Sequence, residues 1–102
     1  MQAKYSAILP QAFSLAQNYP NPFNSETVIR FVLPASGEVE LALYNLAGQK
    51  VTTLVQGVRE AGSHTVRWDG RDDRGQELAS GVYLYRLQAA EREESRKLAL
   101  VR

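Results

Sequence analysis

Short runs of alternating apolar and polar residues recur along this chain and restrict it to strands. Residues 39–44 place Val39, Leu41 and Leu43 at every second position, which is the period of a strand with one buried face. Turn-forming glycine, proline and asparagine separate such runs at intervals of roughly ten residues. The other strand-like segments are residues 13–16, 27–33, 50–55, 64–68, 81–87 and 97–101.

This pattern predicts an all-β fold, namely an immunoglobulin-like antiparallel β-sandwich of about seven strands. A closed barrel is the alternative architecture for strands of this number and length. The chain has 102 residues, which is the length of one domain. We expect residues 13–102 to form that domain, and residues 1–12 to be a linker from a preceding domain or an addition made for expression.

The charge balance and the lack of cysteine exclude several classes of function. The chain contains 12 basic and 11 acidic residues and has a formal net charge of +1. That balance carries no electrostatic signature of a protein that binds nucleic acid or an anionic membrane. Without cysteine there is no disulfide, thiol nucleophile or zinc–thiolate site. His64 is the only histidine, so we expect neither catalysis nor a cofactor. Separately, no apolar run is long enough for a membrane span.

Three aspartates within five residues are the candidate for a metal site. Asp69, Asp72 and Asp73 lie close to Gly70 and Gly75, and Ca²⁺ prefers several oxygen ligands on a loop. The spacing lacks the alternating order of an EF-hand and its distant glutamate. The simpler interpretation is a turn, in which aspartate side chains bind their own backbone and Gly75 adopts a positive φ.

The aromatic residues of two runs allow either a sugar-binding platform or a core. Trp68 and Tyr85 are the candidates for contact with a glycan. Trp68 alternates in step with Val66, however, and this pattern favours the core. Tyr83 stands near the start of its run, where it favours a tyrosine corner whose hydroxyl binds the backbone upstream.

The segment QNYPNPFN, residues 17–24, precedes the first long run and contains two prolines one residue apart. Each proline fixes its own φ and biases the residue before it toward an extended conformation. We therefore expect a stiff entry to the domain, with Tyr19 and Phe23 covering the open end of the sandwich.

Five motifs occur in an order that matches a known family. In chain order they are QNYPNPFN (17–24), YNLAGQKV (44–51), WDGRD (68–72), GVYLYRL (81–87) and RKLAL (96–100). The chain resembles the type A C-terminal sorting domain of the type IX (Por) secretion system of the Bacteroidetes and related lineages. It is also similar to the immunoglobulin-like domain of the flagellar hook-capping protein, most of all in the third and fourth motifs. The resemblance covers about residues 13–102.

The resemblance implies a non-catalytic module that directs the export of a larger protein across the outer membrane. The implied partners are the type IX translocon, an N-terminal cargo domain and a sortase-like peptidase, which in the family often removes the domain and attaches the cargo to a surface lipopolysaccharide. The implied location is the cell surface or the medium, reached through the periplasm. From its charge balance and its lack of a long apolar run, we expect the module itself neither to bind nucleic acid nor to span a membrane.

The family's signal elements carry over to six residues of this chain. They are Pro20, Asn21, Pro22, Gly81, Tyr83 and Lys97. Cleavage is expected in the linker before Phe13. The box departs from the family at Asn24-Ser25-Glu26, where relatives often have a third proline.

The last strand-like run, residues 97–101, ends the sequence and is expected to be an edge strand. Such an edge is available to a translocon or to the edge of another strand. Alternation places Lys97 on the exposed face, where an edge-strand lysine also discourages aggregation. The alternative functions are a carbohydrate-binding module or an immunoglobulin-like spacer in a secreted glycoside hydrolase.

Overall fold

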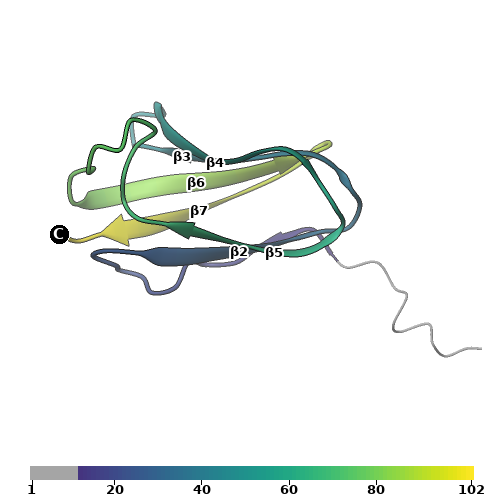
Figure 1. The fold of residues 1–102 in the computed structure, drawn as a ribbon, viewed down its shortest axis with the longest axis horizontal. Helices are drawn as coiled ribbons and strands as arrows, with labels where there is room; N and C mark the ends of the chain where they lie inside the picture. The colour runs from purple at the N-terminus through teal and green to yellow at the C-terminus, as the bar shows by residue number, and fades with distance from the viewer. Residues whose placement is uncertain (1–11) are drawn as a thin grey trace, which may run out of the picture.

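The computed structural model describes residues 12–102, and in this range the chain forms seven strands (Figure 1). The strands pair in two antiparallel sheets with the orders β1–β2–β5 and β4–β3–β6–β7. Their bounds are β1 Ser14–Leu15, β2 Thr27–Leu33, β3 Gly37–Tyr44, β4 Lys50–Arg59, β5 Gly62–Trp68, β6 Gly81–Ala89 and β7 Arg92–Leu100. The immunoglobulin-like sandwich is confirmed. The barrel alternative is wrong, because within residues 12–102 the outer strands β4 and β5 belong to different sheets.

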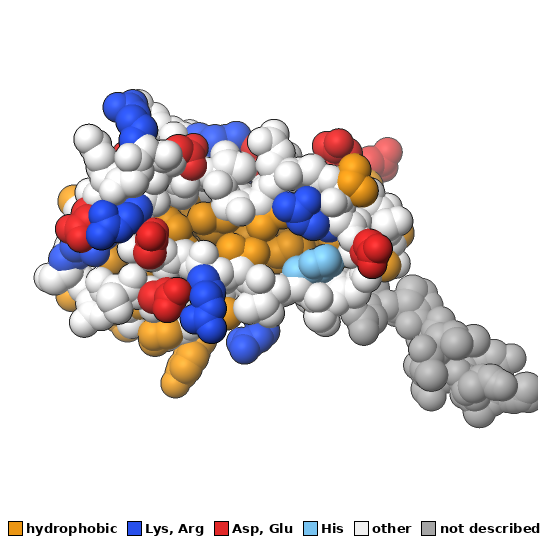
Figure 2. All heavy atoms as spheres, viewed as in Figure 1, with side chains coloured by type: hydrophobic (Ala, Val, Ile, Leu, Met, Phe, Trp, Pro, Cys, Tyr) orange, Lys and Arg blue, Asp and Glu red, His pale blue; other side chains and the backbone are white. Residues whose placement is uncertain are grey.

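The alternating residues of each strand build the core between the two sheets. Ile29 and Phe31 of β2 are buried, as are Leu41 and Leu43 of β3 and Leu87 of β6. Burial of side chains of this size contributes about 1.5–3 kcal/mol each. Figure 2 shows apolar side chains in the hollow where β4 and β5 face each other. The half-buried members of the core on these two strands are Val51, Leu54 and Val66.

Two strands, β4 and β7, extend furthest beyond the ranges that their sequence patterns predict. β4 continues through Gly57, which has a φ of 121°, and ends at Arg59. β7 begins at Arg92, so the charged residues 91–94 are mostly strand and the turn is restricted to Ala90 and Glu91. Residues 92–97 are charged or polar and mostly exposed, and this character hid the strand.

Among residues 12–102, no helix has the length and apolar character needed to cross a membrane. The expected linker, apart from Ala12, and the expected cleavage segment lie outside the described residues.

Candidate functional site

The segment that enters the domain, residues 17–23, lies along the outer edge of β7, and we call it the entry segment. Phe23 donates its N–H to the carbonyl of Ala99 (3.1 Å) and accepts the N–H of Val101 (2.8 Å). The side-chain oxygen of Asn21 accepts the N–H of Ala99 at 2.9 Å. The prediction of a freely available edge on the last strand is therefore wrong for this end of β7, because the chain's own entry segment covers it.

Further contacts join the start of the domain to the middle of β7. Gln17 donates from Nε2 to the carbonyl of Lys97 at 2.7 Å. Leu15 donates its N–H to the carboxylate of Glu94 at 3.0 Å, and its carbonyl accepts from Arg96. The side chains of Gln17, Glu94 and Arg96 thus bind main-chain groups that have no neighbouring strand at this edge of the sheet.

A buried polar cluster fixes the entry segment to β6. The N–H of Asn18 donates to the hydroxyl of Tyr85 (2.8 Å), and that hydroxyl donates to the carbonyl of Ala16 (2.7 Å). The amide of Asn18 donates to the carbonyl of Pro20 and to Oγ1 of Thr27. Burial raises the pKa of Tyr85, and the hydrogen bond from Asn18 opposes part of that rise. Because the polar atoms of this cluster are hydrogen-bonded to one another, the cluster fixes the position of the entry segment relative to β6.

Three aromatic rings close the end of the core beneath the entry segment. The ring centroid of Phe23 lies 5.5 Å from that of Trp68, which lies 6.4 Å from that of Tyr83. The indole N–H of Trp68 donates to the carbonyl of Arg71 at 2.9 Å. The hydroxyl of Tyr83 donates to the carbonyl of Ala79, four residues upstream, at 2.7 Å. Tyr83 thus forms the expected tyrosine corner.

The structure decides between the two interpretations of the aromatic residues and corrects the expected position of Tyr19. Trp68 and Tyr85 are only 3% and 0% exposed, so neither ring offers a face on which a sugar can stack. Phe23 is buried and covers the end of the sandwich as expected, whereas Tyr19 is 75% exposed and does not.

The fold brings the six expected signal residues together. Pro20, Asn21 and Pro22 are exposed on the entry segment. In the neighbouring ladder, Gly81 pairs with Leu100 and Tyr83 pairs with Leu98. Lys97 lies on β7 and its side chain is exposed, as alternation predicts. Tyr83 is buried, so it supports this end of the domain from within.

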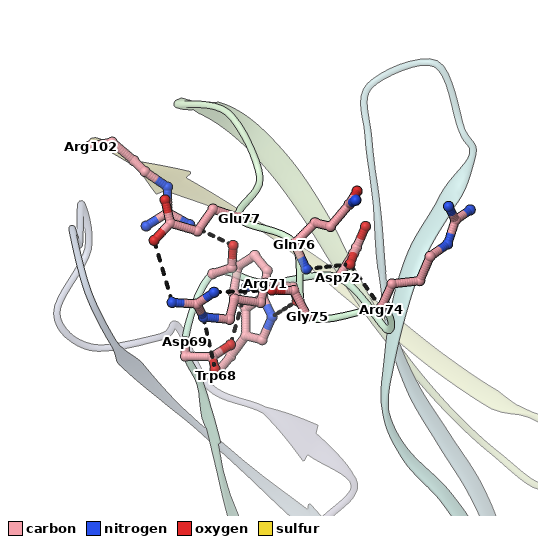
Figure 3. Close-up of polar contacts among 10 residues, drawn as sticks. Trp68, Asp69, Arg71, Asp72, Arg74, Gly75, Gln76, Glu77 and Arg102 are labelled. Atoms are coloured by element: carbon pink, nitrogen blue, oxygen red, sulfur yellow. Dashed lines mark hydrogen bonds and ion pairs between the residues drawn. The ribbon is translucent and has the colours of Figure 1, made fainter.

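The aspartates of the loop after β5 form turns (Figure 3). Oδ1 of Asp72 accepts the N–H groups of Arg74 and Gln76, both at 2.9 Å. Oδ1 of Asp69 accepts the N–H of Arg71 at 3.1 Å. Such aspartate-to-backbone bonds are what the turn interpretation requires, and Gly75 has the expected positive φ of 82°.

Asp73 points away from the other two aspartates, toward β4. Its Oδ1 accepts from Oγ1 of Thr52 (2.6 Å) and from the N–H of Thr53 (3.2 Å). These bonds lower the pKa of Asp73. In the described part of the chain, no three acidic or histidine side chains are grouped as a metal site would require, and this geometry favours the turn interpretation.

Calcium is expected to leave the stability of the domain unchanged. One carboxylate oxygen of each of Asp69, Asp72 and Asp73 is already engaged by a backbone or threonine donor. A thermal melt with excess Ca²⁺ and one with a chelator should therefore give the same Tm. A rise in Tm with Ca²⁺ that Mg²⁺ does not reproduce would contradict this assignment.

Arg102 secures the same loop, and sequence analysis did not single it out. Its guanidinium donates to the carbonyls of Gly70 (2.6 Å) and Leu78 (2.8 Å), and its N–H donates to Oγ of Ser80 (2.8 Å). Figure 3 shows Arg102 reaching over this loop. Gly70 has a φ of 77°, and a Cβ at this position would lie 2.7 Å from the guanidinium. Arg102 and Gly70 are 32 residues apart in sequence, and no local pattern predicts their contact.

Replacing Tyr85 with phenylalanine is expected to lower the free energy of unfolding by about 1–3 kcal/mol, because the N–H of Asn18 loses its buried partner. The difference in the free energy of unfolding between the two proteins should become smaller at alkaline pH. Since the folded-state pKa of Tyr85 is raised, the unfolded chain loses this proton first, near pH 10. The stability that the phenol contributes is thus complete below about pH 10 and is lost as the pH rises through the folded pKa.

Urea unfolding of both proteins at neutral pH and above pH 10 measures this effect. The other tyrosines are present in both proteins, so the difference between the two reports Tyr85. A difference that stays constant with pH would contradict the assignment.

Comparison with known proteins places this fold in a family. The family model described as the FlgD Ig-like domain matches residues 21–93. No curated protein matches the sequence. FlgD from Pseudomonas aeruginosa, a solved structure, is 26% identical with a TM-score of 0.56, and the match covers 72% of this chain and 58% of that one.

Two solved structures from Porphyromonas gingivalis are also similar. Dimeric latent PorU has a TM-score of 0.68 at 17% identity, and PorZ has a TM-score of 0.56 at 21% identity. PorZ is described as an essential bacterial surface component of the type-IX secretion system. The matches cover 89% and 88% of this chain but only 10% and 11% of those chains. These two likenesses establish a shared fold, and the family match establishes more: the chain belongs to the FlgD Ig-like domain family.

Proposed function

We propose that this domain is a non-catalytic C-terminal sorting domain, which directs a larger protein across the outer membrane by type IX secretion and to the cell surface. One observation carries the proposal. The residues that the resemblance implies as the signal come from distant parts of the chain and meet at the entry segment and the last two strands. A folded surface assembled in this way suits recognition by another protein.

The likeness to PorZ supports the same context, since PorZ is itself a surface component of that secretion system. The partners are the translocon, the cargo domain that precedes residue 13, and a sortase-like peptidase that acts on the linker. The domain contributes recognition only. Pro20, Asn21, Pro22, Gly81 and Lys97 are the exposed members of the signal, while the buried Tyr83 holds the underlying strand in place.

An immunoglobulin-like spacer within a secreted protein is the second candidate. The family match favours it, because the match ends at residue 93 and leaves out the last motif. The carbohydrate-binding alternative has lost its candidate contacts, since Trp68 and Tyr85 are buried.

A fusion experiment separates the two candidates. Residues 13–102 are placed after a reporter with a periplasmic leader, in a bacterium with type IX secretion and in a matched strain that lacks the translocon. We expect the reporter on the surface or in the medium of the first strain only. Retention of the reporter in the periplasm of both strains would favour the spacer and reject the sorting function.

A further inference from the structure

We propose further that the sorting signal is conformational and is recognised only while the entry segment is docked on β7. This inference rests on the proposed function and specifies how the signal is presented. In this scheme Asn21 and Gln17 are positioning residues: they hold the two parts of the signal together and make no contact with the receptor.

The first argument is the way in which the edge of β7 is covered. Phe23 and Leu100 form a parallel bridge, and Asn21 binds the N–H of Ala99 across 78 residues of sequence. Gln17 binds the carbonyl of Lys97 across 80 residues. An incoming strand would need these same backbone groups of β7. Strand addition at this end of β7 is therefore blocked while the entry segment is docked.

The second argument is the surface that docking creates. A hollow of about 480 Å³ is bounded by Pro20, by residues 22–26 and by Val101, which follows β7. Tyr19 and Val101 are 75% and 52% exposed. Two chain segments thus supply the walls of one hollow, and release of the entry segment would separate Val101 from the rest of the wall. A peptide with the sequence of β7 alone lacks this surface.

The third argument is the use of the side chain of Asn21. Asn21 is an exposed residue, yet its Oδ1 is committed to the N–H of Ala99. An oxygen acceptor is what this position requires to keep the segment in place. Aspartate supplies that acceptor and leucine does not, so the two substitutions separate positioning from direct recognition by the amide nitrogen.

The test compares Asn21→Asp and Asn21→Leu in the reporter fusion, with Asn45→Leu as the matched control. Asn45 also caps backbone N–H groups through Oδ1, those of Ala47 and Gln49, but in the turn between β3 and β4. We expect Asn21→Leu to lose export and to speed hydrogen exchange of the Ala99 amide about fivefold, as expected when one hydrogen bond is removed. Asn21→Asp and Asn45→Leu should export like the unchanged domain.

A disulfide adds a second arm, because the chain has no cysteine of its own. The pair Asn21→Cys and Ala99→Cys locks the entry segment on β7 once it is oxidised in the periplasm. We expect the oxidised double variant to be exported, and each single cysteine variant serves as its control.

Each other outcome rejects a defined part of the proposal. Normal export of Asn21→Leu with accelerated exchange at Ala99 rejects the conformational signal and leaves the sorting function standing. Unchanged exchange in Asn21→Leu shows that this bond does not hold the segment, and it rejects the positioning role. Loss of export in Asn21→Asp shows direct recognition of the amide, and blocked export of the disulfide form shows that release is required. If the unchanged domain is not exported, both proposals fail.

Discussion

Substitution of Trp68 by alanine is expected to lower the free energy of unfolding by about 3–5 kcal/mol, a typical cost for removing a large buried aromatic residue. Trp68 is 3% exposed and packs between Phe23 and Tyr83. Its loss leaves a cavity that the two sheets cannot fill, and it also removes the partner of the carbonyl of Arg71. Urea unfolding followed by far-ultraviolet circular dichroism measures the change without relying on the fluorescence of this residue.

Tyr19→Ala is the matched control, since Tyr19 is a large aromatic residue that is 75% exposed. It should change the free energy of unfolding by no more than about 0.5 kcal/mol. Equal effects of the two substitutions would contradict the burial pattern described above. A stable Trp68→Ala protein that had lost binding to a glycan would restore the carbohydrate-binding interpretation.

The strands and their buried faces were predictable because they depend on local alternation. Val39, Leu41 and Leu43 recur at a period of two and are buried, and only the small Ala42 between them is buried out of step. The tyrosine corner at Tyr83 and the turn at Asp72 were also predictable, since each rests on a bond to a residue four positions away. A hydrogen bond can be predicted from local sequence when its donor and acceptor lie in the same motif.

The covered edge of β7 was not predictable, because its determinants lie about 80 residues apart. Gln17, Asn18 and Asn21 look like ordinary turn-forming residues in sequence. Nothing local shows that Asn18 is buried against Tyr85 or that Asn21 binds the backbone of β7. The edge could be assigned only once the position of the entry segment was known.

Replacing Phe23 with alanine is expected to detach the entry segment as well as to destabilise the core. The loss of a buried phenylalanine costs about 3–5 kcal/mol. The main chain of Phe23 also forms two hydrogen bonds, one to Ala99 of β7 and one to Val101 just after it, and these depend on the ring holding the segment against Trp68. We therefore expect faster hydrogen exchange at the amides of Ala99 and Val101, together with self-association at high protein concentration as the edge of β7 becomes free.

Phe23→Leu is the control, because it retains most of the apolar volume and should keep the segment docked at a smaller cost in stability. The effects of Phe23→Ala and Trp68→Ala should also be less than additive in the double variant, since the two rings are in contact and share one cavity. Additive effects, or an unchanged exchange rate at Ala99 in Phe23→Ala, would show that the ring does not hold the segment. The entry segment would then be held by its polar contacts, which are the cluster of Asn18 and Tyr85, the bonds of Gln17 and Asn21 to β7 and the bridge of Tyr19 to β2.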